Sequence, residues 1–315
     1  MKEINIAKTI LLKRKEKKIS KQFGEHHVID GISFTVPEHC IFGFLGQNGA
    51  GKTTTMKMIL EVLKPTSGNI YVCGEQVTYG ETKTNRLIDY LPDVPEFYYY
   101  MTPKEYLRLC GEMSGMSRQQ IKQKSEILLE LVGLANVNRK IGGFSRGMKQ
   151  RLGIAQALLN EPRILICDEP TSALDPIGRK EILDILLKVK EQTTVIFSTH
   201  ILSDVERICD EVAVLQEGQL VLKGPLSELK AKGRKNQILI TFKSEGLARQ
   251  LKEPLELLSR VQMVSHQQEG LLIELTELEV GSLEVLRFLI QHNVGLHKYE
   301  VLEPTLESLF MEVVK

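Results

Sequence analysis

The sequence predicts an α/β fold with a parallel sheet, followed by a small α+β domain. Three observations support this prediction. An apolar run at 40–45 leads into the glycine-rich segment GQNGAGKT at 46–53, and a run with helical character follows it. Two later apolar runs end in polar residues, as buried strands of parallel sheets do where a ligand binds. Beyond about residue 231 the pattern changes to short alternating strands and helices.

The segment Gly46–Thr53 lies between a buried strand and a helix, which is the context of a phosphate-binding loop. Its glycines allow the backbone to curl, so that successive N–H groups and the helix dipole point at one anion. In such a loop Lys52 contacts the β- and γ-phosphates, and the hydroxyl of Thr53 binds Mg²⁺. The alternative is a glycine-rich turn with a surface lysine. The predicted phosphate-binding residues are Gly46, Gln47, Asn48, Gly49, Ala50, Gly51, Lys52, Thr53 and Thr54.

Length and composition limit the classes of protein. The chain has 315 residues, enough for two domains, and its formal net charge of +1 does not indicate a broad affinity for nucleic acid or membranes. Its five cysteines are scattered, which favours free thiols in a reducing compartment. No stretch reaches the roughly 18 apolar residues that span a bilayer. We therefore expect a cytosolic protein that reaches a membrane only through a partner.

The residues before the loop, 4–36, have the alternation and turns of antiparallel strands. Phe23 ends one of these strands; an aromatic there usually packs in a core, but an adenine ring could also stack on it. After the first helix we expect a strand at 69–73 and a later apolar strand that ends at Asp93. Four consecutive aromatics at 97–100 either pack locally or form a partner surface.

Residues 103–160 are predicted to be mainly helical. Thr102 and Pro103 provide an N-cap and a first helical residue. The segment FSRGMKQR at 144–151 opens another helix, with Ser145 at its N-cap position. By itself, this segment predicts only a capped helix.

Two acids follow the apolar run at 163–167, at the carboxyl end of a predicted strand. The side chains of Asp168 and Glu169 should point to different sides, so that one can serve Mg²⁺ and the other a water molecule. A second buried strand, 194–198, ends beside His200. A lone histidine is more often structural, but this position near the same crevice favours a role in the site.

The last 85 or so residues are expected to fold separately, after a polar linker at 232–236. Their pattern predicts the order βαββαβ, which suggests a ferredoxin-like domain, and a closing helix at 304–314. We find no catalytic cluster in this tail. The expected strands are 237–242, 261–266, 270–276 and 296–301, and the expected helices are 245–258 and 281–292.

Taken together, these segments resemble the ATP-binding subunits of ATP-binding-cassette (ABC) transporters over residues 1 to about 230. GQNGAGKT is similar to the Walker A loop, and ILICDE at 164–169 to the Walker B strand with its catalytic glutamate. FSRGMKQR takes the place of the family's LSGGQ signature. The other matches are SALD at 172–175 with the D-loop, His200 with the switch histidine, Phe23 with the adenine-stacking aromatic and Asp93 with the Q-loop glutamine.

Two motifs depart from the family pattern. Arg146 and Met148 replace a glycine and the final glutamine of the signature, whereas Ser145 and Gly147 are retained. Asp93 replaces the Q-loop glutamine; its carboxylate can contact Mg²⁺ or water, but it cannot donate as an amide does. The FSRGMKQR form and the tail segment EPTLESLF resemble ABC-2-type exporter ATPases.

The resemblance implies that ATP and Mg²⁺ bind here, and that two subunits pack head to tail so that the signature of one closes on ATP held by the other. Binding would close this homodimer and hydrolysis would open it. The implied catalytic residues are Lys52, Glu169 and His200; the metal ligands are Thr53, Asp168 and Asp93; further ATP contacts are Phe23, Ser145, Gly147 and Asp175.

The predicted fold is therefore a P-loop ATPase of the ABC type at 1–230, with an antiparallel β-subdomain and a helical subdomain at about 95–160. A C-terminal α+β domain, ferredoxin-like, occupies 231–315. The resemblance implies an ATPase that drives a separate ABC-2-type permease, as an exporter subunit at the cytoplasmic face of the cell membrane. The aromatic cluster at 97–100 would then face that permease. The sequence of this chain does not identify the transported substrate.

Two other functions stay open at this point. A soluble ABC ATPase acting on nucleic acid or ribosomes would usually have two cassettes, long coiled-coil insertions or basic arms. This chain has one cassette and none of these features, so no nucleic acid is expected. A non-catalytic protein that only holds ATP is disfavoured because Lys52, Asp168, Glu169 and His200 occur together.

Overall fold

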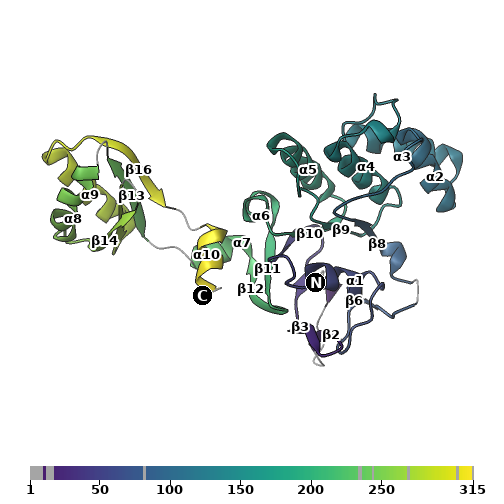
Figure 1. Cartoon of the computed structure of the whole chain (residues 1–315), viewed down its shortest axis with the longest axis horizontal. Helices are drawn as coiled ribbons and strands as arrows, with labels where there is room; N and C mark the ends of the chain where they lie inside the picture. The colour runs from purple at the N-terminus through teal and green to yellow at the C-terminus, as the bar shows by residue number, and fades with distance from the viewer. Residues whose placement is uncertain are drawn as a thin grey trace, which may run out of the picture. The chain divides into compact units, whose positions relative to one another are not determined.

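The structure is a computed structural model, and it describes residues 10–11, 18–80, 83–232, 236–242, 245–267, 270–302 and 305–313. These residues form two compact units (Figure 1). The first ends at Ser227 and also contains Val313, and the second comprises Glu228–Glu312. Both this division and the domain boundary expected after residue 230 fall within α7 (Leu226–Lys232).

A six-stranded sheet forms the centre of the first unit, with the order β12-β11-β5-β10-β9-β8. Neighbouring strands pair in parallel, except that β11 and β12 pair antiparallel. Strands β5, β10 and β9 are buried along their whole length, which explains their nearly continuous apolar sequences. The bounds are β5 (Ile41–Leu45), β8 (Ile88–Leu91), β9 (Ile164–Asp168), β10 (Thr194–Thr199), β11 (Glu211–Gln216) and β12 (Gln219–Pro225).

Short antiparallel strands accompany this sheet, as the sequence predicts. They share one hydrophobic core with β5, in which the ring centroid of Phe34 lies 5.4 Å from that of Phe42 and 5.3 Å from that of Phe44. The strand expected at 69–73 is reduced to two residues. The bounds are β1 (Ile10–Leu11), β2 (Ile19–Phe23), β3 (His26–Ile32), β4 (Thr35–Val36), β6 (Tyr71–Val72) and β7 (Glu75–Gln76).

The helical region consists of α2 (Pro103–Met113), α3 (Arg118–Leu131) and α4 (Arg146–Leu158), which lie together beside β8 (Figure 1). Two capping boxes fix the starts of the first two helices, at Thr102 with Glu105 and at Ser117 with Gln120. Short 3-10 turns are η1 (Asn85–Leu87) and η2 (Ile141–Gly143). The other helices are α1 (Lys52–Ile59), α5 (Pro176–Val189) and α6 (Leu202–Ile208).

The second unit confirms the predicted order βαββαβ. Its four strands form an antiparallel sheet with the order β14-β15-β13-β16, which is the ferredoxin-like arrangement. Its apolar side chains form a separate hydrophobic core. The bounds are β13 (Gln237–Phe242), α8 (Glu245–Glu256), β14 (Val261–Gln267), β15 (Gly270–Leu275), α9 (Leu278–Gln291) and β16 (Leu296–Leu302), followed by α10 (Leu306–Val313). The linker residues 233–235 and the start of the predicted closing helix at Pro304 lie outside the described residues.

Candidate active site

The glycine-rich loop joins β5 to α1, and its glycines serve two purposes. A Cβ on Gly46 would lie 2.5 Å from the carbonyl oxygen of Leu215, and one on Gly51 would lie 2.4 Å from Cδ1 of Ile29. These two glycines are therefore required by packing within the chain. Gly49 has a φ of +85° and open space around it, so the tip of the loop has room beside its backbone for a ligand.

The other loop residues differ in exposure. Gln47 and Asn48 are exposed at the tip, Ala50 is buried, and Thr54 is half-buried in the first turn of α1. This arrangement leaves the backbone of the tip accessible while the end of the loop is fixed in the core.

Lys52 places a buried charge inside the loop. Its side chain is only 6% exposed, and its Nζ donates hydrogen bonds to the carbonyl oxygens of Gly46 (2.7 Å) and Gln47 (3.3 Å). The same nitrogen lies 3.2 Å from Oε1 of Glu169. Because Glu169 follows β9, this ion pair joins the glycine-rich loop to the carboxyl end of β9.

Asp168 ends β9 and receives two hydrogen bonds on one oxygen. The hydroxyls of Thr53 (2.9 Å) and Tyr90 (3.3 Å) both donate to its Oδ2. Burial and the negative charge of Asp168 raise the pKa of Tyr90 above its ordinary value, so the Tyr90 hydroxyl stays protonated and donates at neutral pH. Among the described residues, Oδ1 of the same carboxylate is buried and has no hydrogen-bond partner.

These oxygens fit Mg²⁺. A hydroxyl and a carboxylate are suitable ligands, and Mg²⁺ at phosphate sites typically takes one or two protein ligands besides phosphate oxygens and water. The unpartnered Oδ1 of Asp168, beside the hydroxyl of Thr53, gives such an ion an available acceptor. Across the described ranges, no group of three or more His, Cys, Asp or Glu side chains gathers as an all-protein metal site.

Glu169 is held by the ends of two neighbouring strands. Its Oε2 lies 2.9 Å from Nδ1 of His200 and accepts a hydrogen bond of 3.4 Å from the hydroxyl of Thr199, while its N–H donates to the carbonyl of Ser198 (2.9 Å). Its φ of +50° is in the left-handed region, which is uncommon for a residue with a side chain. The backbone thus directs the Glu169 carboxylate toward Lys52, at the carboxyl ends of the central strands.

The remaining predicted ATP contacts lie on other elements. Phe23 ends β2 with 49% of its surface exposed, and Nζ of Lys21 lies 4.7 Å from its ring centroid. Asp175 caps α5, and its Oδ1 accepts from the N–H of Gly178 (3.2 Å). The structure therefore does not bring these two side chains into contact with Lys52, and their roles in ATP binding stay predictions.

The signature segment opens α4. Oγ of Ser145 caps this helix by accepting from the N–H of Met148 (3.3 Å). A Cβ on Gly147 would meet only Cδ2 of Leu174, at an ordinary contact distance of 3.8 Å. Packing within the chain therefore does not require a glycine at this position.

Asp93 contacts α4. Its Oδ1 accepts a hydrogen bond from Nη2 of Arg146 at 2.7 Å, and its backbone carbonyl accepts one from Nε2 of Gln150. The carboxylate is thus engaged by Arg146, and the metal ligand role of Asp93 stays a prediction. We did not predict this pairing or the hydrogen bond from Tyr90 to Asp168. The strand that contains Tyr90 has no alternating burial pattern, so it carries no local signal that could have indicated this contact.

Comparison with known proteins identifies the family. The family model described as "ABC transporter" matches residues 29–172, and that of the "ATP-binding protein DrrA1-3-like, C-terminal domain" matches residues 224–314. The Bacillus subtilis (strain 168) "Uncharacterized ABC transporter ATP-binding protein YxlF" is 39% identical over 298 residues, which cover 94% of this chain and 97% of that protein. The chain belongs to the ABC transporter ATP-binding proteins. The resemblance inferred from the motifs is confirmed.

Two further similarities support this assignment. The "Linearmycin resistance ATP-binding protein LnrL" of the same Bacillus subtilis strain is 33% identical over 301 residues, covering 94% of this chain and 96% of that protein. A solved structure, "Structure of ATP binding subunit of ABC transporter", superposes with a TM-score of 0.62 at 31% identity, over 71% of this chain and 93% of that one. As a member of this family, the chain is an ATPase with the P-loop fold.

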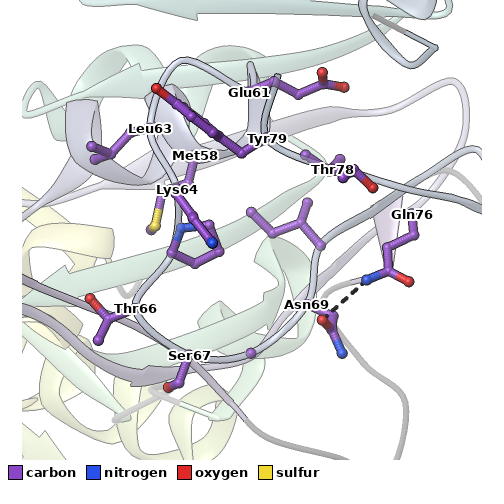
Figure 2. Close-up of a pocket in the computed structure, with 14 residues that line it drawn as sticks. Met58, Glu61, Leu63, Lys64, Thr66, Ser67, Asn69, Gln76, Thr78 and Tyr79 are labelled. Carbon is purple, nitrogen blue, oxygen red and sulfur yellow. Dashed lines mark hydrogen bonds between the residues drawn. The ribbon is translucent and has the colours of Figure 1, made fainter. Parts of the chain in front are cut away.

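A surface pocket of about 290 Å³ lies at the C-terminal end of α1, whereas the glycine-rich loop lies at the N-terminal end of this helix. Figure 2 shows the residues that line the pocket. It is formed around Met58 and Glu61, with a hydrogen bond of 3.2 Å from Gln76 to Asn69 on its wall. None of its lining residues belongs to the predicted ATP-binding set. The pocket therefore lies apart from the predicted ATP-binding residues. Among the helices of the described ranges, none combines the length and apolar character needed to cross a membrane.

Proposed function

We propose that this chain is the ATP-hydrolysing subunit of an exporter, that it works as a head-to-tail homodimer, and that it binds a separate ABC-2-type permease at the cytoplasmic face of the membrane. The observation that carries the proposal is the cluster formed by Lys52, Thr53, Asp168 and Glu169 at the carboxyl ends of β5 and β9. The similarity to a protein named for linearmycin resistance supports export, because export of a toxic compound is one route to resistance.

The cluster provides the groups that ATP hydrolysis requires. Lys52 and the loop N–H groups hold the β- and γ-phosphates, whose oxygens replace the carbonyls that Lys52 contacts in this structure. Glu169 orients the attacking water and accepts its proton, and His200 holds that carboxylate. Thr53 and Asp168 would hold Mg²⁺, which when bound neutralises phosphate charge.

The position of the signature segment supports the proposed dimer. Phosphate groups bind well at helix N-termini, and α4 presents Ser145 and Gly147 at its N-terminus. The open space around Gly147 suits close approach by a ligand outside this chain. We infer that the Ser145 segment of one subunit covers the ATP that Lys52 of the other subunit holds. A pair with two-fold symmetry then contains two equivalent sites. ATP binding then closes the pair, and hydrolysis opens it.

The aromatic cluster at 97–100 divides into a buried and an exposed part. Phe97 is buried, with its ring centroid 5.0 Å from that of Tyr106. Tyr98, Tyr99 and Tyr100 are each more than half exposed. Exposed tyrosines are enriched at protein interfaces, and these three lie between β8 and the helical region. They are our candidate contact with the permease.

The permease contact is tested by co-purification of the tagged full-length chain from detergent-solubilised membranes of its own cells. A multi-spanning membrane protein should co-purify, and replacing Tyr98, Tyr99 and Tyr100 with alanine should abolish this binding. Tyr79→Ala is the matched control, because Tyr79 is also exposed but lies in the pocket of Figure 2. Recovery with ribosomes or nucleic acid, in place of a membrane protein, would support the soluble alternative.

Adenine stacking on Phe23 gives a second prediction. Phe23→Ala should raise the Kd for ATP by about tenfold, because stacking of a base on an aromatic ring contributes roughly 1–3 kcal/mol. The Kd for inorganic tripolyphosphate should not change, since it has no base. Both are measured by calorimetry, with Tyr79→Ala as the exposed-aromatic control. Equal weakening of both ligands would show that Phe23 acts on the phosphate site instead.

A further inference from the structure

The two motifs that depart from the family pattern are joined to each other. Asp93, at the Q-loop position, and Arg146, in the signature, form an ion pair with 2.7 Å between Oδ1 and Nη2. They are 53 residues apart in sequence. Each is unusual for its motif, and each supplies the charge that the other needs.

The ion pair belongs to a larger contact along one face of α4. Arg146, Gln150 and Gly153 are spaced i, i+4 and i+7, so they lie on the same side of the helix. Gln150, which is buried, donates to the backbone carbonyl of Asp93. A Cβ on Gly153 would lie 2.5 Å from Cδ1 of Leu91, so the helix and the end of β8 are in close contact there.

The segment that contains Asp93 also contacts the carboxylate of Asp168. Tyr90, three residues before Asp93, donates its hydroxyl hydrogen bond to Asp168. Residues 90–93 therefore contact the Walker B carboxylate at one end and the start of the signature helix at the other. These contacts connect the Asp168 carboxylate to the start of α4, next to Ser145.

Charge explains why Arg146 needs a partner. It is the first residue of α4, where the positive end of the helix dipole disfavours a cation. The Asp93 carboxylate offsets this cost and holds the guanidinium toward the segment after β8. Without it, the guanidinium is free to move toward the surface that Ser145 and Gly147 present.

We propose that Asp93 and Arg146 are a positioning pair that fixes the signature end of α4 on the segment after β8, so that the state of the ATP site in one chain sets the orientation of its Ser145. This inference rests on the proposed dimer and deepens it. It assigns Asp93 to this pair, and it makes the two departures from the family pattern compensate each other.

A double-mutant cycle on the full-length chain tests the pair. We expect Asp93→Asn and Arg146→Gln each to lower kcat for ATP by about fivefold to twentyfold, with the Kd of the monomer for ATP unchanged within about twofold. The double variant should be no slower than the slower single variant. The reversed pair, Asp93→Arg with Arg146→Asp, should recover to within about threefold of wild type.

A matched control is available in the same unit. Arg207 and Asp184 join α6 to α5 through an ion pair of the same length, 2.7 Å, with side chains 40% and 45% exposed, against 39% and 46% for Arg146 and Asp93. Arg207→Gln and Asp184→Asn should leave kcat unchanged. Multiplicative effects at Asp93 and Arg146, or a reversed pair as slow as the single variants, would overturn the proposal. The proposal would also be overturned if Asp93→Asn needed more Mg²⁺ for ATP hydrolysis than wild type and the reversed pair did not restore the wild-type requirement.

Amide hydrogen exchange gives a readout that needs no ATPase activity. Losing the pair should speed exchange in the first turn of α4, including the N–H of Met148 that Ser145 caps, by about fivefold or more. The reversed pair should restore protection. If wild type hydrolyses no ATP, the proposed function fails, and exchange still decides whether the pair orders the signature. Unchanged exchange in both single variants would overturn the pair itself.

Discussion

Replacing Glu169 with glutamine is expected to lower the rate of ATP hydrolysis by about 10²- to 10⁴-fold while ATP still binds. The glutamine is nearly the same size and can keep the hydrogen bond from Thr199. It cannot accept the proton of the attacking water. Because the other groups that hold ATP are unchanged, ATP should remain bound and hold two chains together.

The contact with Lys52 sharpens this expectation. Oε1 of Glu169 lies 3.2 Å from Nζ of Lys52, so the carboxylate competes with phosphate for the same cation. Glu169→Gln removes this competition. The variant should therefore bind ATP at least as tightly as wild type, whereas a variant that only disturbed folding would bind it more weakly.

Single-turnover hydrolysis and the mass of the particle in solution check this prediction. With ATP and Mg²⁺, Glu169→Gln should elute as a dimer, and wild type should return to a monomer as ATP is consumed. Glu161→Gln is a suitable control, because Glu161 is an exposed glutamate paired with Lys124 outside the site. Hydrolysis within about tenfold of wild type would show that another group serves as base. Absence of an ATP-dependent dimer would contradict the proposed head-to-tail dimer.

The elements that surround the site could be predicted because their residues carry local signals. β5, β9 and β10 are continuous apolar runs, and the structure places each within one or two residues of its predicted bounds. The tail was also predictable in part from β13, in which partly buried and buried residues alternate along the whole strand. α6 and β12 were missed. α6 has no side-chain cap at its start, and β12 is only partly buried, so neither has the signal that marks the central elements.

The contacts between motifs were less predictable than the motifs. Lys52, Thr53, Asp168 and Glu169 could be chosen because each stands at the end of a buried strand or in a glycine-rich loop. The pairs Asp93–Arg146 and Tyr90–Asp168 are 53 and 78 residues apart. Which side chains meet there depends on the parallel register of β8 with β9 and on the position of α4, and a single sequence does not encode either as a local pattern.

Lys52→Met should raise the Kd for ATP by about 10- to 100-fold and abolish measurable hydrolysis. A hydrogen bond to a charged group contributes roughly 1.5–3 kcal/mol, and about 1.4 kcal/mol corresponds to a factor of ten in Kd. The substitution also removes the donor to Gly46 and Gln47 and the cation beside Glu169. A carboxylate left without that cation would repel the phosphates, so Lys52→Met should weaken ATP binding more than adenosine binding.

The comparison with adenosine separates a phosphate contact from a folding defect. Lys57→Met is the matched control, because Lys57 lies on the same helix with an exposed side chain. Calorimetry should give an unchanged Kd for adenosine in both variants and a weakened Kd for ATP in Lys52→Met alone. Adding Glu169→Gln to Lys52→Met should recover part of the lost affinity, since the unpaired carboxylate is then neutral. If the double variant binds ATP no better than Lys52→Met, the carboxylate does not oppose phosphate, and the buried ion pair has no part in ATP binding.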